Sequence, residues 1–374
     1  MSLSFYKNTL QFLSSHSNLP VEGNHLRRLK VLSLQISSCM RSQSSSLEGL
    51  SERESGYSKA INTCIAQTKR WLSSKWTDWE SFFAPYARLI LTQLVRRGEL
   101  IFIIDGSEMA GNCVVLMLSV VWRGYALPLV WLTKEGEKGH FSEQMHLDLL
   151  DLVDTILPPQ STKASERTYR VVLLGDGEFD GEQVRQRCNK QGWEFVLRTS
   201  VDRLIDCGNG EIARIDTLEP EKGQTIVFVP LACQADNAIW WHGKGFEKPI
   251  PLLTNMEIGK MACAYYKKRF KIESLFKQFK SQGFKIQKAK LEGEHRVANL
   301  IIVVALAFIF TFAMGILIKK ITKEQLKQFL RPDKIQKMLP ITIAQKAIKL
   351  APDIATAIFS DLSNNFNVFS KNDS

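Results

Sequence analysis

The sequence lacks any closely spaced pair of cysteines. Its seven cysteines, an odd number, are scattered between positions 39 and 263 with no C-x-x-C. This spacing excludes a disulfide framework and a cysteine-based zinc site, and it favours a reducing compartment. The first twenty residues also lack a basic stretch followed by an apolar run. We therefore expect no signal peptide and a cytoplasmic protein.

Acidic residues are fewer than basic ones. The 374 residues include 49 Lys and Arg but 38 Asp and Glu, so the formal net charge is +11. Such an excess favours an anionic partner, and DNA, RNA and an acidic membrane surface all fit it. Hydrophobic residues at 45% and charged residues at 23% are ordinary for a folded protein, and the length suffices for two or three domains.

Much of the positive charge in the N-terminal part lies on predicted helices. The patterns predict helices over residues 24–40, with Asn24 as the cap, over 58–72, and from 78 or 81 to 97. Basic clusters on short helices favour a DNA-binding region over residues 1–98. The alternative is the solvated face of a small helical bundle. No recognition helix can be identified. The clustered cations are Arg27, Arg28, Lys30, Lys69 and Arg70.

Beyond residue 98 the pattern changes to strands. Leu100–Ile104 is an apolar run that ends at Asp105 and Gly106, and strands 113–122 and 125–133 follow with a hairpin turn between them. A helix is predicted over 142–157 and a second buried strand over 171–174, ending before Asp176. Asp180 and Gln183 predict a capping box for a helix to residue 191, and 194–198 is another strand.

This succession of elements is typical of an α/β fold with an RNase H-like sheet. In that topology the first and fourth strands are neighbours, so their ends would bring Asp105 and Asp176 together. Two carboxylates at one sheet edge meet the geometric requirement for shared metal ions. The alternative for each is an Asp-Gly turn with no chemical role.

Residues 264–283, AYYKKRFKIESLFKQFKSQG, predict one continuous helix, since they contain no proline and no interior glycine. One face is apolar, with Tyr265, Ile272, Leu275, Phe276 and Phe279. A second stripe carries Tyr266, Arg269, Glu273 and Lys280, within an arc of about 60°. A carboxylate flanked by cations suits a metal site beside phosphate ligands. A solvated helix with i,i+4 ion pairs is the alternative.

That stripe matches Y-x2-R-x3-E-x6-K, and the chain resembles the bacterial insertion-sequence DDE transposases of the YREK group, an IS-four-like family that cuts and pastes through hairpin ends. The segments LIFIIDG, with Asp105, and VVLLGDGEF, with Asp176, lie upstream in the same order. The resemblance extends from about residue 100 to 315. It implies that Asp105, Asp176 and Glu273 form the catalytic triad.

The resemblance also implies the chemistry and the partners. The triad would hold two Mg²⁺ or Mn²⁺ ions for DNA strand cleavage and strand transfer, because hard cations suit carboxylate ligands. Tyr266, Arg269 and Lys280 would contact DNA. The partners would be the inverted-repeat ends, the target DNA and a second copy in a homodimeric synaptic complex. The localisation would be cytoplasmic and nucleoid-associated, with no membrane.

Residues 201–249 read as a β-strand insertion, with Gly, Asn and Asp turns between short strands. Hairpin-forming relatives hold a flipped base with a tryptophan in such an insertion. Trp240 or Trp241 could stack a base in the same way, and a place in the hydrophobic core is the alternative. The core would resume over 250–318, after its first part at 99–200.

The stretch 297–318 contains no charged residue and is long enough to cross a membrane. A helix buried on all sides is equally apolar, and we favour burial because a lone anchor after a nuclease core has no evident purpose. Residues 319–374 read as amphipathic helices, over 324–330, 341–350 and 354–362, that could contact another subunit. Two alternatives remain for the whole chain: an inactive or repurposed DNA-binding protein, and a membrane-anchored basic protein.

Overall fold

The computed structural model describes residues 4–53, 59–136, 141–161, 166–207, 211–230, 236–320 and 338–370. The predicted helix over 324–330 lies outside the described residues. Six of the seven cysteines are described, and all six are free thiols.

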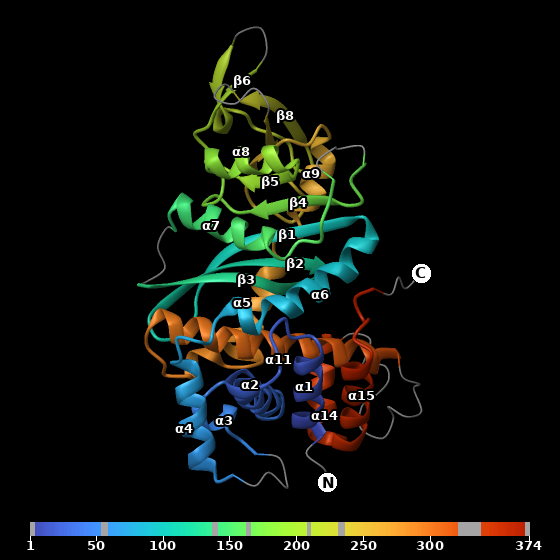
Figure 1. Cartoon of the computed structure of the whole chain (residues 1–374). Coiled ribbons are helices and arrows are strands. Elements are labelled where there is room, and N and C mark those ends of the chain that lie inside the picture. The colour runs from blue at the N-terminus through green and yellow to red at the C-terminus, as the bar shows by residue number, and fades with distance from the viewer. Residues whose placement is uncertain are drawn as a thin grey trace.

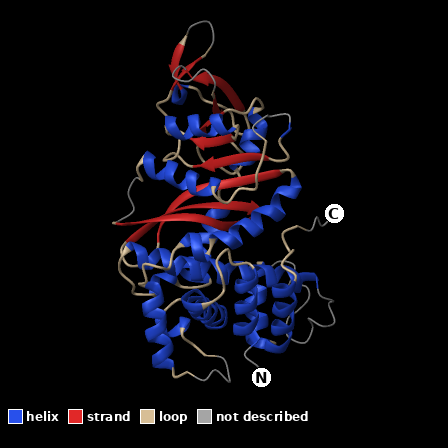
Figure 2. Cartoon of the chain, viewed as in Figure 1, coloured by secondary structure: helices blue, strands red, loops and turns tan. Residues whose placement is uncertain are grey.

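A mixed sheet forms the centre of the described part of the chain (Figures 1 and 2). Its strands run in the order β3-β2-β1-β4-β5-β10-β9-β8-β6-β7. Their bounds are β1 Glu99–Glu108, β2 Cys113–Trp122, β3 Tyr125–Glu135, β4 Arg170–Gly175, β5 Glu194–Arg198, β6 Leu204–Asp206, β7 Ile212–Arg214, β8 Thr225–Pro230, β9 Asn237–Trp241 and β10 Ile250–Thr254.

The first five strands have the arrangement predicted for an RNase H-like core. β1, β2 and β3 form an antiparallel meander, and the β2–β3 turn at Arg123 and Gly124 has positive φ at both residues, as a two-residue hairpin requires. β1 is parallel to β4, and β4 is parallel to β5. The RNase H-like α/β prediction is confirmed.

The predicted β-strand insertion extends the same sheet. β10 pairs with β5 and β9, and β8, β6 and β7 continue the order outward. The short strand β6 was not predicted, since its three residues sit among turn-forming residues. The sheet therefore continues from the β1–β3 meander into the insertion.

Helices cover the sheet and form a layer beneath it (Figure 1), where α7 and α8 cross the near face of the sheet and pack on each other. The helical bounds are α1 Ser4–Ser15, α2 Gly23–Ser42, α3 Leu47–Leu50, α4 Ile61–Leu72, α5 Trp79–Phe82, α6 Ala84–Leu94, α7 Glu143–Asp154, α8 Glu182–Gln191, α9 Gly259–Tyr266, α10 Lys271–Lys277, α11 Glu294–Lys320, α14 Pro340–Leu350 and α15 Pro352–Asn364.

The apolar stretch 297–318 forms most of α11, and burial is confirmed. α11 lies between β3 and the helical layer, where it packs on α2, α4, α14 and α15 (Figure 1). It is the one helix among the described residues with the length and composition to cross a membrane, and 94% of that window is buried inside the protein. Helices from both ends of the chain provide its cover.

Three details of the predicted helices are wrong. α2 begins at Gly23 after Glu22, so Asn24 lies inside the helix and caps nothing. α8 follows Gly181, and Asp180 does not cap it, because the Asp180 carboxylate accepts hydrogen bonds from Thr199 and Arg203, while the backbone N–H of Gln183 donates to Glu143 of α7. The helix predicted to reach residue 97 is broken at Phe83, since α5 ends there and α6 begins with Pro85 in its first turn.

Candidate active site

Asp105 lies inside β1, two residues beyond the last pair that β1 forms with β4. The predicted end of the strand at this residue is wrong, because β1 continues to Glu108 against β2. The turn alternative therefore fails here. The ring of Phe141 packs over Gly106, the residue after Asp105. Only glycine fits at this position, because a Cβ would lie 2.4 Å from that ring.

Asp176 follows β4 directly, and it also lies two residues beyond the last β1–β4 pair. The backbone N–H of Glu178 donates to its Oδ1 at 3.2 Å, so the carboxylate also organises the turn. Because β1 and β4 are parallel neighbours, Asp105 and Asp176 lie at the same level of the sheet. The predicted proximity of Asp105 and Asp176 on neighbouring strands is confirmed.

The single helix predicted over 264–283 is wrong. The chain forms α9, a turn over residues 267–270, α10, and then a π-helical turn over Gln278–Gln282. In the first turn the backbone bonds shorten to i→i−3, for example from Arg269 N to Tyr266 O at 2.9 Å. The predicted apolar face is nevertheless buried along its whole length.

Glu273 lies on α10 and completes a cluster of three carboxylates around one guanidinium. Nη1 of Arg269 is 3.3 Å from Oδ2 of Asp105 and 3.8 Å from Oδ2 of Asp176, while Nη2 is 3.2 Å from Oε1 of Glu273. The break at residues 267–270 places Arg269 at the turn, where its side chain reaches both strands. The site therefore combines β1, the β4 end and α10.

The three carboxylates of the cluster face a single positive charge, that of Arg269. Burial raises the pKa of Asp105 to about 6, and the neighbouring charges of Asp176 and Glu273 act in the same direction, while Arg269 opposes them. Arg269 is 8% exposed, and its buried Nε has no hydrogen-bond partner. One guanidinium thus faces three carboxylates in a partly dry site, which favours further cations there.

The donor set fits a hard divalent cation. All three acidic groups offer carboxylate oxygens, the ligands that Mg²⁺ and Mn²⁺ prefer, and no sulfur or imidazole joins them. Among the described residues no group of three acidic, His or Cys side chains lies at metal-binding spacing. Arg269 accounts for this spacing, because its guanidinium separates the three carboxylates.

The other two residues of the predicted stripe lie apart from this contact. Tyr266 is buried at 1% exposure, burial raises its pKa, and the guanidinium of Arg269 lies 6.0 Å from its ring. Its ring therefore lies beside the Arg269 guanidinium in the interior of the protein. Lys280 is half-buried in the π-helical turn. The roles of Tyr266, Arg269 and Lys280 in binding DNA stay predictions.

Both tryptophans of the insertion belong to its core. Trp240 is 5% and Trp241 4% exposed. The indole N–H of Trp240 donates to Leu218 O, and Trp241 packs edge-on against Phe246. This is the alternative that the sequence left open for them.

Sequence reasoning missed the central position of Arg269. The pattern placed it on one continuous helical face with Glu273 and Lys280, as a contact for DNA. A signal existed in the run of cations over residues 267–269 beside Phe270, whose ring the Arg269 guanidinium covers at 4.6 Å. The tight turn itself contains neither glycine nor proline, so its position was not visible.

Known proteins match parts of this chain. The solved structure of Marinitoga piezophila Argonaute in complex with 5′ OH guide RNA and target DNA is 13% identical and covers 53% of this chain; the chain spans 29% of that protein, and the TM-score of 0.22 supports no statement about fold. No curated protein matches the chain. Residues 138–310 match the family described as the transposase DDE domain, a stretch that includes Asp176 and Glu273 and begins after Asp105. This match supports a DDE transposase.

Proposed function

We propose that the protein cuts DNA at the ends of an insertion sequence and joins those ends to target DNA, as a transposase of the YREK group. The observation that carries the proposal is the convergence of Asp105, Asp176 and Glu273 on one guanidinium. Three elements far apart in sequence supply one carboxylate each. A solvated helix with local ion pairs has no reason to reach two strand ends.

Asp105, Asp176 and Glu273 would hold two divalent cations, Mg²⁺ or Mn²⁺. Bound there, such ions would supply positive charge that favours deprotonation of a water or 3′-hydroxyl nucleophile and stabilises the leaving oxygen. Glu273 has a side chain 45% exposed, so it can face DNA, whereas Asp105 is 15% exposed and is fixed by the N–H of Gly106. The sheet therefore provides the rigid part of the site and α10 the adjustable part.

The N-terminal helices offer a second surface for DNA. Arg27 and Arg28 of α2 and Arg70 of α4 line one hollow of about 250 Å³ together with Trp71. Three cations around one hollow suit phosphate groups of a duplex. Two copies of the chain would pair in the synaptic complex, in the cytoplasm and at the nucleoid.

The test is cleavage of duplex DNA that contains the element's end, with Mg²⁺, by the full chain. Glu273→Gln keeps the side chain's shape and removes its charge, so we expect cleavage to fall by more than about a hundredfold while DNA binding persists. Glu292→Gln, at an exposed position that takes no part in the Arg269 contacts, is the matched control. Wild-type cleavage by Glu273→Gln would refute the triad. Binding without cleavage by the wild type would favour an inactive DNA-binding protein.

A further inference from the structure

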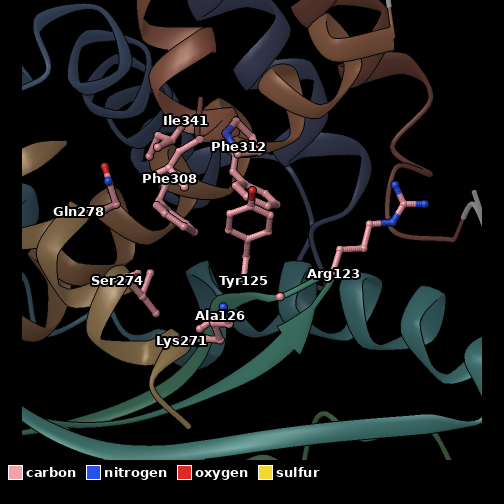
Figure 3. Close-up of a pocket in the computed structure, with 13 residues that line it drawn as sticks. Arg123, Tyr125, Ala126, Lys271, Ser274, Gln278, Phe308, Phe312 and Ile341 are labelled. Carbon is pink, nitrogen blue, oxygen red and sulfur yellow. The ribbon is translucent and has the colours of Figure 1, made fainter. Parts of the chain in front are cut away.

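A cavity of about 320 Å³ lies between the start of β3, α10 and α11. Aromatic rings form one wall: Phe308 and Phe312 of α11 stack at 5.8 Å with 12° between their planes, and Tyr125 meets Phe312 edge-on at 5.0 Å (Figure 3). Flat apolar faces of this kind bind a flat ring by stacking. Phe308 and Phe312 are buried, at 4% and 2% exposure, and Tyr125 is half-buried, so Tyr125 supplies the accessible ring on which a planar aromatic group can stack.

Polar groups stand opposite the aromatic wall. Ser274 and Gln278, from α10 and the π-helical turn, line the facing side of the cavity (Figure 3). Gln278 is 6% exposed, and its Nε2 donates to Gln282 Oε1 at 3.2 Å, which holds the amide in place. A fixed amide beside a stacking surface offers hydrogen bonds to the edge of a nitrogen heterocycle.

The rim is cationic. Arg123 of the β2–β3 turn and Lys271 of α10 line the cavity, and its described lining includes no Asp or Glu. A second hollow of about 370 Å³ shares Arg123 and adds Arg97 and Lys268. The acid of that hollow, Glu99, is already engaged by Tyr265 and Arg170. The two hollows thus form one positively charged band across the hairpin turn.

We propose that this cavity binds an unpaired nucleotide of a DNA strand, with the base on the half-buried ring of Tyr125, beside the buried rings of Phe308 and Phe312, and the adjoining phosphate on the exposed Lys271. An aromatic wall, a polar edge and a cationic rim match the base, its edge and its phosphates in turn. Charge argues against an apolar protein segment as the occupant, because such a segment carries no negative group to pair with the cations of the rim.

The position relative to the carboxylates fits this occupant. Lys271 and Glu273 lie two residues apart on α10, so they are about 3 Å apart along the helix and point to opposite sides of it. A strand that leaves the carboxylates can cross α10 and reach the cavity. The proposal therefore rests on the proposed function, since it assumes a DNA strand at the carboxylate site.

The experiment measures the affinity of the full chain for single-stranded oligothymidylate and for a duplex of equal length, with EDTA present. Tyr125→Ala removes the ring at a partly exposed position, and we expect about tenfold weaker binding of the single strand. Tyr125→Phe keeps the ring and should bind as the wild type does. Duplex affinity should be the same in all three proteins.

A charge comparison keeps the proposal testable if Tyr125→Ala does not fold. Lys271→Ala should reduce the salt dependence of oligothymidylate binding by about 0.7 in the log–log slope, the value for one phosphate contact of a single strand. Lys277→Ala removes the same charge from an exposed position of the same helix and should leave the slope unchanged. Equal slopes for both variants would overturn the proposal.

Three further results would also overturn it. The wild type could fail to bind oligothymidylate. Tyr125→Ala could weaken binding of the duplex as much as binding of the single strand, which would mean that the positively charged band binds backbone phosphates and that the cavity holds no base. Tyr125→Ala could instead convert a dimer to a monomer with unchanged oligothymidylate affinity, which would assign the cavity to a second copy. Because EDTA excludes metal chemistry, these results are independent of cleavage by Glu273→Gln, and either proposal can fail alone.

Discussion

At the scale of single residues, Arg269 decides how the carboxylates sit. Its guanidinium contacts Asp105, Asp176 and Glu273 and is 10% exposed as a side chain. Three neighbouring carboxylates of like charge repel one another, and one cation offsets part of that repulsion. Arg269 therefore acts as the counter-charge of the site when no other cation is bound. A metal ion and Arg269 would then stabilise the same carboxylates.

This role predicts the response of Arg269→Ala to metal. With EDTA the variant should melt at a lower temperature than the wild type, because the Asp105 carboxylate, 15% exposed, loses its counter-charge, while the contacts with the more exposed Asp176 and Glu273 contribute little. Added Mg²⁺ should restore more of the melting temperature in the variant than it adds to the wild type, since the ion replaces the lost charge. Thermal unfolding in EDTA and in Mg²⁺ measures both effects.

Arg187→Ala is the matched control. Arg187 also contacts two carboxylates, Asp151 and Asp154, but these lie on α7 away from the candidate active site. This variant should lose stability without any extra gain from Mg²⁺. An equal Mg²⁺ response in both variants would show that Arg269 does not compensate for the charge at the metal site.

At the scale of elements, the region around Glu273 shows where sequence reasoning ends. The apolar positions of residues 264–283 predicted the buried face correctly, because burial follows side-chain type. The break over 267–270 could not be predicted, since tertiary contacts cause it: Arg269 is drawn to two strand ends, and Phe270 packs toward Phe246. Local helix propensity depends on neither of these tertiary contacts.

Helix α11 gives the prediction at this scale. Val304 is fully buried, and Val304→Asp would place an unpaired charge in the core at a cost of several kcal/mol. We expect the variant to unfold or aggregate. Arg296→Asp, at an exposed position of the same helix, should fold normally. Circular dichroism and size-exclusion chromatography distinguish the two; a folded Val304→Asp protein would mean that α11 is not packed as described.

At the scale of the whole molecule, the strand succession predicted the RNase H-like meander, and Asp105 and Asp176 meet as their strands require. What the sequence did not reveal is that both ends of the chain share one core around α11. The phenol of Tyr86 donates to Leu13 O, the amide of Gln93 donates to Phe366 O, and the amide of Asn299 on α11 donates to Leu72 O. Contacts between residues 73 to 273 positions apart leave no local pattern in the sequence.

This shared core determines how DNA binding must be tested. Removing residues 1–98 would uncover α11, so charge substitutions in the full chain are the suitable change. Arg28→Gln with Arg70→Gln removes two cations of the α2–α4 hollow, and the log–log slope of duplex affinity against salt should fall by about 1.8, at about 0.9 per phosphate contact. Lys346→Gln with Lys349→Gln removes the same charge from exposed positions of α14 and should leave the slope unchanged. Filter binding over a range of salt concentrations measures both slopes, and equal losses would mean that net charge, and not the hollow, attracts the duplex.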